Sequence, residues 1–312
     1  RTAAELLVAV SEAEVDGLSG TVVSTSRLGL PELPSARGGS AVSLPGLLSG
    51  STTARVWKAG EERSRVAVDG SFAEYDVVRD GRDVWTFDSA SSDVTHLVLP
   101  QGQDRPATEA PAGGATPEEI AESLLAHVGE TTDVSVGRAA MVAERAAYEL
   151  VLDPQDPGTL VGTVRIAVDG ETSVPLRVQV FGEDQSEPAL EIGFTSVTFE
   201  EPDASVFDFV TPPGATVTQR SLEGLERPAP GARTAPRSGA APQLLGKGWT
   251  SVVELAGVEV PEDAAGLLDQ LSTPVAGGRV VTSSLVSLLL LDDGRVLAGA
   301  VPADRLVELA GR

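Results

Sequence analysis

The residues able to perform catalysis are few, and their spacing matches no catalytic arrangement. The chain has no cysteine and only two histidines, His96 and His127. His96 falls in a predicted strand and His127 near the end of a predicted helix. Neither belongs to an H-E-x-x-H or other metal-binding spacing. Ser19 follows a helix and lacks the G-x-S-x-G spacing of a nucleophile elbow. A structural role is therefore favoured for both histidines.

Phosphate and metal sites find no better support. The glycine pairs Gly38-Gly39 and Gly113-Gly114 lie in predicted loops, outside any G-x-x-x-x-G-K-[ST] or strand-to-helix G-x-G-x-x-G pattern. Two acidic pairs, Asp153 with Asp156 and Asp292 with Asp293, lie in turns and do not match a calcium loop. The sequence therefore predicts a non-enzymatic protein with no catalytic residues, no cofactor and no metal.

Composition narrows the possible partners. The 312 residues carry a formal net charge of −23, with Lys58 and Lys247 as the two lysines. Such a chain lacks the basic surface that binds nucleic acid and would be repelled by anionic lipid. No apolar run reaches the ~18 residues of a transmembrane helix. Because the chain starts at Arg1 and runs directly into a helical pattern, any export signal is expected to have been removed or never to have existed.

The elements around these residues are predicted to be mainly strands. From Tyr148 to Pro213, apolar and polar residues alternate in successive segments separated by turns such as Asp169-Gly170. This alternation is typical of antiparallel strands with one apolar face. Hairpin-like units precede them, and Thr21–Ser26 looks like a further strand.

Two helices and one unusual loop accompany the strands. Residues 2–15 and 116–128 have helical patterns that begin with capping boxes at Thr2 and Thr116. Residues 28–51 are rich in leucine, glycine and proline without clear periodicity, which indicates either a loop packed on the core or an apolar flap.

Three regions are predicted along the chain. Residues 1–218 form the main domain, and residues 219–246, rich in proline, glycine, alanine and arginine, form a linker. Residues 247–312 form a small α+β unit. Its predicted elements are a strand at Trp249–Leu255, a helix at Pro261–Leu271, a strand at Arg279–Leu291, a strand at Val296–Val301 and a final helix starting at Pro302 or Ala303.

What covers the apolar face of the strands decides the function. If two short helices leave it partly uncovered, an apolar ligand could gain several kcal/mol by burying it. If the helices and the leucine-rich loop fill it completely, the chain is a closed structural module. Both interpretations remain open from the residues alone.

Several sequence pieces, in their order and spacing, resemble one family. They are Leu28-Gly29-Leu30-Pro31, Ser49-Gly50-Ser51-Thr52-Thr53-Ala54-Arg55-Val56-Trp57, Asp83-Val84-Trp85-Thr86-Phe87-Asp88, Thr116-Pro117-Glu118-Glu119, Ala167-Val168-Asp169-Gly170-Glu171-Thr172, Val174-Pro175-Leu176-Arg177-Val178, Phe207-Asp208-Phe209 and Thr211-Pro212-Pro213-Gly214-Ala215. Together, over about residues 2–218, they resemble the actinobacterial branch of the outer-membrane lipoprotein-carrier superfamily, the LolA-like proteins, which includes the RseB/MucB sigma-factor regulators.

The resemblance implies an α+β fold: a curved antiparallel half-barrel whose concave face takes acyl chains beneath a helical lid. It also implies an exported, cell-envelope protein whose removed signal or anchor preceded Arg1. The family's ligand-gating basic residue would be Lys58, Arg63 or Arg65. Its partner would be a lipid or acylated protein or, in an RseB-like alternative, the exported part of a membrane anti-sigma factor.

The hypothesis assigns the cavity to apolar strand residues and the lid to leucines. The lipid-binding lining would be Val56, Val66, Val68, Trp85, Phe87, Leu97, Leu150, Leu152, Ile166, Val168, Leu176, Val178, Ile192 and Phe194. The lid would carry Leu44, Leu47, Leu48, Leu124 and Leu125.

Overall fold

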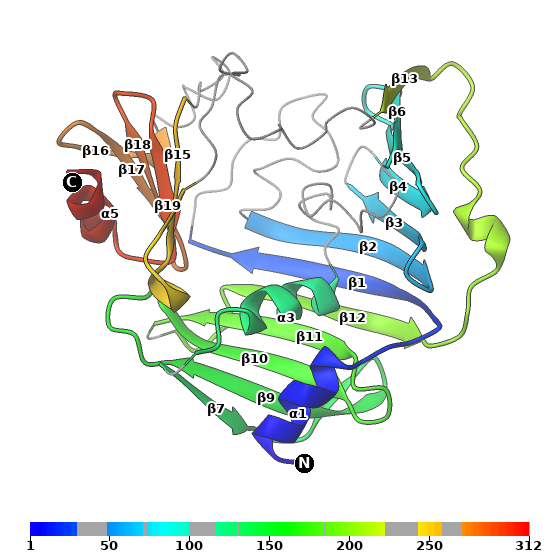
Figure 1. Ribbon diagram of the computed structural model, residues 1–312, viewed down its shortest axis with the longest axis horizontal. Helices are drawn as coiled ribbons and strands as arrows, with labels where there is room; N and C mark the ends of the chain where they lie inside the picture. Colours follow the sequence, from blue (N-terminus) through cyan, green and yellow to red (C-terminus); the bar gives the residue numbers. More distant parts are fainter. Residues whose placement is uncertain are drawn as a thin grey trace, which may run out of the picture.

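The structure is a computed structural model. It describes residues 1–29, 49–70, 74–99, 116–129, 131–183, 185–221, 243–257 and 270–311. These residues form one sheet of thirteen strands and one of six strands, with few helices. Figure 1 shows the larger sheet curving upward from β7 to β13, with the smaller sheet beside it. The predicted antiparallel sheet is confirmed.

The larger sheet is open, with β13 and β7 at its two edges. Its strands, in spatial order, are β13 (Thr216–Ser221), β6 (Asp93–Val98), β5 (Asp83–Asp88), β4 (Glu74–Asp80), β3 (Arg63–Asp69), β2 (Ser49–Ala59), β1 (Gly17–Arg27), β12 (Leu190–Thr198), β11 (Pro175–Gly182), β10 (Val161–Asp169), β9 (Arg145–Pro154) and β7 (Thr132–Val136). A short strand, β8 (Ala140–Val142), also pairs with β9. Neighbours are antiparallel except β13, which runs parallel to β6.

One face of this sheet is apolar because side chains alternate along each strand. Directly opposed residues share a face, so Leu150, Ile166 and Val178 form one apolar row across β9, β10 and β11. Val56 and Val66 continue the same face on β2 and β3. All five belong to one buried hydrophobic cluster.

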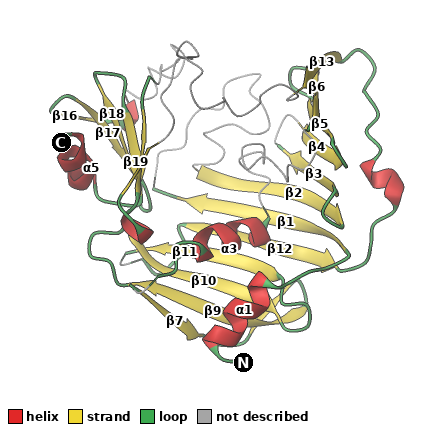
Figure 2. Cartoon of the chain, viewed as in Figure 1, coloured by secondary structure: helices red, strands yellow, loops and turns green. Residues whose placement is uncertain are grey.

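Two helices pack on this inner face, as Figures 1 and 2 show. Helix α1 (Ala3–Ser11) buries Leu6 against the cluster, and α3 (Pro117–Leu125) buries Ala121. Both begin with the predicted capping boxes, at Thr2 and Thr116. The first helix is shorter than the predicted 2–15 because the chain turns into β1 after residue 12.

The opposite face of β3–β5 is covered by the segment that follows β12. A short 3-10 helix, η1 (Ala204–Phe207), buries Phe207 in a small cluster with Ala59 and Val78. Arg65 on β3 donates a hydrogen bond to the carbonyl oxygen of Val206, at 3.1 Å. The segment that contains η1 therefore covers the outer face of β3–β5.

The smaller sheet has the strand order β14 (Gln243–Leu245), β15 (Val252–Leu255), β19 (Val296–Gly299), β18 (Ser287–Leu291), β17 (Gly278–Thr282) and β16 (Thr273–Val275). Helix α5 (Ala303–Ala310) packs on one side and buries Leu306. The single strand predicted at Arg279–Leu291 is wrong. Ser283 forms a turn there, with its backbone N–H donating to Val286 O at 2.9 Å, so β17 and β18 form a hairpin.

Trp249 joins the two sheets. It lies in the 3-10 helix η2 (Gly248–Thr250) rather than in the predicted strand, and its side chain is buried in the core of the larger sheet. Its indole Nε1 donates to Thr132 Oγ1 at 2.9 Å. A second contact comes from Ser284, whose backbone N–H donates to Leu28 O at 3.0 Å. The smaller sheet is therefore docked against the larger one.

Part of the predicted organisation lies outside the described residues. This applies to most of the predicted helix at Pro261–Leu271 and to Leu44, Leu47 and Leu48. Among the described helices, none is long and apolar enough to cross a membrane.

Candidate binding groove

A groove lies on the inner face between the first turns of α3 and the strands β1–β4. Its volume is about 180 Å³. Apolar side chains from four strands and one turn lie in its wall: Leu18, Val56, Val66, Val174 and Phe194. Of the fourteen predicted lining residues, Val56, Val66 and Phe194 contribute to it. The groove is therefore a smaller site than the half-barrel cavity predicted from the sequence.

Close approach of two strands positions Phe194 in this wall. The register of β1 against β12 shifts between Thr21 and Val22, where a bulge interrupts the ladder. A Cβ on Gly20 would lie 2.4 Å from Ser196 O and 2.9 Å from the ring of Phe194. A side chain at this position would therefore collide with the backbone of β12 and with the ring of Phe194.

Most of the predicted lining is buried core. Eleven of the fourteen residues belong to the single cluster that α1 and α3 cover: Val56, Val66, Val68, Leu150, Leu152, Ile166, Val168, Leu176, Val178, Ile192 and Phe194. Leu97 also lies on the inner face but packs with Val84 and Leu99 in a separate cluster. The apolar face on β9–β12 is thus largely filled by protein side chains.

Trp85 and Phe87 lie on the other face of the sheet. Trp85 is opposite Val78 and His96, and its ring stacks on His96 at 3.7 Å and on Phe209 at 5.1 Å. Side chains alternate along β5, so Val84 and Thr86 face the inner side, whereas Trp85 and Phe87 face the outer side. The structure does not bring Trp85 and Phe87 together with the other predicted lining residues.

Helix α3 holds charged residues at the groove. The capping box fixes its first turn, with Glu119 bonded to the backbone N–H of Thr116 at 3.1 Å. Glu118, one residue earlier, pairs with Lys58 on β2 at 3.4 Å. Glu122 also lies in the wall, and burial, followed by the charge of Glu118, raises its pKa. The wall formed by α3 is therefore acidic.

Leu124 and Leu125 lie further along α3, partly buried against the main cluster. They hold the helix on the sheet and are absent from the described groove wall. No motif or spacing indicated that Leu18, Val174 and Arg79 would join the site. The capping box did predict that Glu118 would lie in a first helical turn, and it was the available signal for the acidic wall.

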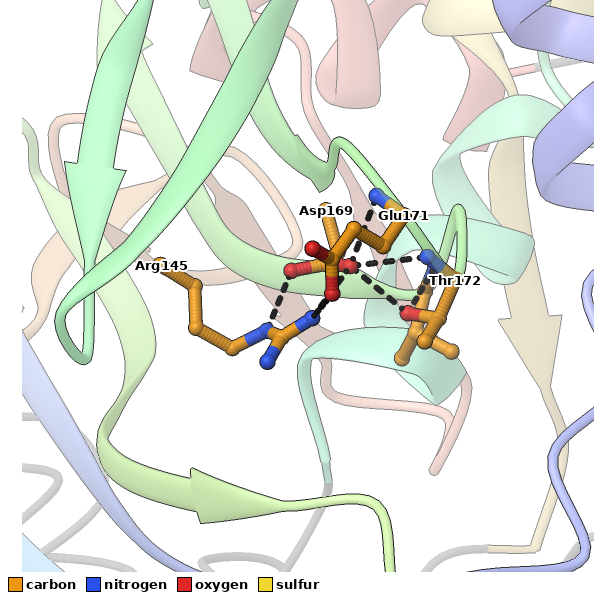
Figure 3. Close-up of polar contacts among 5 residues, drawn as sticks. Arg145, Asp169, Glu171 and Thr172 are labelled. Atoms are coloured by element: carbon orange, nitrogen blue, oxygen red, sulfur yellow. Dashed lines mark hydrogen bonds and ion pairs between the residues drawn. The ribbon is translucent and has the colours of Figure 1, made fainter.

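A polar network of Arg145, Asp169, Glu171 and Thr172 holds the β10–β11 turn that leads to Val174 (Figure 3). Arg145 on β9 donates to both carboxylate oxygens of Asp169, from Nε at 2.5 Å and from Nη2 at 3.0 Å. The same carboxylate accepts from the backbone N–H of Thr172 at 2.8 Å and of Glu171 at 3.0 Å. The Asp169 N–H in turn donates to Val174 O at 2.9 Å.

The electrostatics of Asp169 follow from this network. Its side chain is 1% exposed, and such burial by itself would raise its pKa. The hydrogen bonds from Arg145 and from residues 171 and 172 outweigh burial and lower the pKa of Asp169 to about 2. The carboxylate is therefore charged at neutral pH and fixes the β10–β11 turn beside the groove.

The two histidines lie away from the groove. Neither histidine lies in its described wall: His96 is bonded to Asp83 at 2.6 Å on the outer face, and His127 follows the end of α3. Among the described residues, no group of three or more His, Asp or Glu could hold a metal ion. An apolar wall with charged edges can bind an apolar chain that carries a polar end.

No family model matches the chain, and no curated protein matches it. Solved structures do. A chain of the Pseudomonas aeruginosa MucA/MucB complex aligns with a TM-score of 0.51 and 17% identity, covering 99% of this chain and 96% of that one. A structure of MucB in complex with MucA(peri) gives 0.50 and 16%, covering 99% and 97%. A LolA superfamily protein from Nitrosomonas europaea gives 0.28 and 14%, covering 67% and 98%.

At these identities the comparisons establish the fold. The chain has a MucB-like fold, in agreement with the LolA-like and RseB/MucB-like resemblance of its sequence. Because the alignments cover 99% of the chain, they extend over both sheets.

Proposed function

We propose that this is a non-enzymatic, extracytoplasmic protein that binds part of a lipid or acylated protein in the groove beneath α3. The observation that carries the proposal is the apolar wall formed by Leu18, Val56, Val66, Val174 and Phe194, beside a charged edge. The MucB-like fold supports a place in the cell envelope. In this proposal α3 acts as the lid. Residues 1–218 are the binding domain and residues 247–312 the C-terminal unit, and β13 and β14 extend these two units into the ends of the predicted linker 219–246.

The size of the groove limits what it holds. Small-molecule pockets commonly measure about 300–1,000 Å³, whereas this groove measures about 180 Å³. A stretch of one acyl chain would fit without displacing the core on β9–β12. The remainder of a lipid would extend beyond the described wall.

Filling the groove is expected to abolish binding. Ser64 is half-buried on β3 and lines the groove, so Ser64→Trp would occupy its space. We expect the affinity for a fluorescent fatty acid to fall at least about tenfold. This is the loss expected when one or two methylene groups of the ligand are no longer buried. Ser196→Trp is the matched control because Ser196 is exposed on β12. Equal binding by both variants, or no binding by the unmodified protein, would reject the groove as an acyl site.

A second candidate function is regulation through a protein partner. The observation that favours it is the alignment of 99% of the chain with a structure of the MucA/MucB complex, the smaller sheet included. In this proposal the protein binds the exported part of a membrane anti-sigma factor, and the lipid acts as the signal.

Binding of such a segment can be measured directly. We expect the purified exported segment of an anti-sigma factor from the same organism to bind in titration calorimetry. We also expect a saturating fatty acid to change its Kd, because two ligands that favour different states of one protein are thermodynamically linked. If the segment binds with the same Kd with and without fatty acid, the lipid is not the signal for the protein partner. If the segment does not bind, the regulator proposal is rejected and the lipid-binding proposal remains.

A further inference from the structure

A polar row crosses the groove next to its apolar row. Lys58, Ser64 and Arg79 are directly opposed on β2, β3 and β4, so their side chains share the inner face. Val56 and Val66 form the neighbouring row, two residues further along the same strands. Strands lie about 5 Å apart, so Lys58 and Arg79 are separated by about 10 Å with a small serine between them. A ligand in this groove therefore meets an apolar side and a cationic side.

The arginines of β3 and β4 differ in whether they already have a carboxylate partner. Arg63 bonds Glu201 at 2.9 Å, and Arg65 bonds the buried carboxylate of Asp76 at 2.7 Å. Arg79 donates from Nε to the carbonyl oxygen of Gly81 at 3.0 Å. Within the described part of the chain, its two terminal nitrogens make no hydrogen bond or ion pair.

A guanidinium that has no carboxylate partner among the described residues is unusual in a protein with a net charge of −23. Acidic residues are abundant, yet none of the three glutamates that α3 contributes to the groove wall is bonded to Arg79 in the described structure. Glu118 is bonded to Lys58, and Glu119 is bonded within the capping box. Glu122 also lies in the groove wall, and no hydrogen bond or ion pair joins it to Arg79 among the described residues. The planar guanidinium fork is thus available to a carboxylate or phosphate.

We infer that Arg79 binds the anionic head of a single-chain amphiphile whose tail lies along Val56 and Val66. This inference rests on the proposed function and names the ligand class: a chain with a carboxylate or phosphate end. Lys58 can contribute a second positive charge by exchanging Glu118 for the ligand.

Titration calorimetry with chain-matched amphiphiles below their micelle concentrations tests this. The probes are decanoate, decyl phosphate, decanol, decyltrimethylammonium and inorganic phosphate. We expect both anionic amphiphiles to bind at least about tenfold more tightly than decanol, the usual scale of a charge-assisted hydrogen bond. Arg79→Gln should bring the affinities for the anionic amphiphiles down to that for decanol, whereas Arg79→Lys should retain part of the preference. Arg165→Gln, an exposed change on the outer face of β10, is the control and should change nothing.

The outcomes separate this inference from the proposed function. Equal affinity for decanoate and decanol would overturn the role of Arg79 and leave acyl binding intact. Tightest binding of decyltrimethylammonium would overturn it in favour of the acidic α3 wall. If inorganic phosphate binds as tightly as decyl phosphate, the groove is a site for free anions, and the proposal of an amphiphilic ligand is rejected. Failure of every amphiphile would reject both proposals. If Arg79→Gln does not fold, the inference is tested by whether the unmodified protein binds decanoate and decyl phosphate more tightly than decanol.

Discussion

Replacing Arg145 by alanine is expected to lower the free energy of unfolding by about 2–3 kcal/mol at pH 7. The variant leaves the Asp169 carboxylate, 1% exposed, without its guanidinium partner. Residues 171 and 172 still donate to it, so the loss stays below that of a fully unpaired buried charge. Urea unfolding, followed by far-ultraviolet circular dichroism, measures the change. The β10–β11 turn that holds Val174 should loosen as well, which would weaken groove binding.

The pH dependence identifies the cause of this loss. The pKa of Asp169 in the folded protein is lowered from 3.8 to about 2. Its charge therefore stabilises the fold fully above pH 4, and this contribution disappears as the pH falls toward 2. In Arg145→Ala the buried carboxyl is protonated more readily, so the difference between variant and parent should narrow over the same range. A difference that stays constant between pH 7 and 3 would instead indicate packing of Arg145 on Phe199, whose ring centre lies 4.8 Å away.

Arg165→Ala provides a matched control for Arg145→Ala. Arg165 also lies on the larger sheet, but it is 46% exposed and its nearest carboxylate, on Glu149, is 4.0 Å away. An exposed pair of this kind contributes at most about 1 kcal/mol. Equal losses in the two variants would show that removing any arginine from this sheet has the same effect, and the buried network would then have no special role.

Local patterns predicted much of the fold, because they depend on neighbours in sequence. Both capping boxes formed as predicted, at Thr2 and Thr116. The alternation on β9, β10 and β11 also placed Leu150, Ile166 and Val178 on one face. In each case the deciding interaction lies within one turn or one strand.

The predictions that depended on tertiary context were less accurate. Apolar character alone placed Trp85 in the lining, although alternation puts it opposite Val78 and beneath Phe209 on the outer face. The strand predicted at Arg279–Leu291 was drawn through Thr282, Ser283 and Ser284, where the chain turns into a hairpin. Composition also could not show that Arg79 would have no carboxylate partner among the described residues, because pairing is decided by which carboxylates the fold brings near. The groove was therefore predictable as an apolar face but not in its position or extent.

Replacing Trp249 by alanine is expected to have the largest effect, a loss of about 3–5 kcal/mol in the free energy of unfolding. The indole belongs to the smaller sheet's segment but is buried, 5% exposed, in the core of the larger sheet. Its removal leaves a cavity beside His127, whose ring centre lies 5.9 Å from that of Trp249. Urea unfolding of the variant should lose its single transition, because the two sheets would no longer unfold together.

The conservative variant Trp249→Phe separates packing from hydrogen bonding. It keeps most of the apolar volume and removes the N–H that donates to Thr132 Oγ1 at 2.9 Å. The expected loss is therefore about 1 kcal/mol, with a single transition retained. Leu244→Ala, a 67% exposed position on β14, should change little. If Trp249→Ala unfolds in one step with the stability of the parent, the backbone contact from Leu160 N–H to Ala300 O at 2.8 Å, rather than the indole, holds the sheets together. The first turn of α3 lines the groove, and His127, just after the last turn of α3, contacts Trp249. Loss of the Trp249 contact should therefore shift α3 and change the affinity of the groove for its ligand. The smaller sheet would then be coupled to the ligand site.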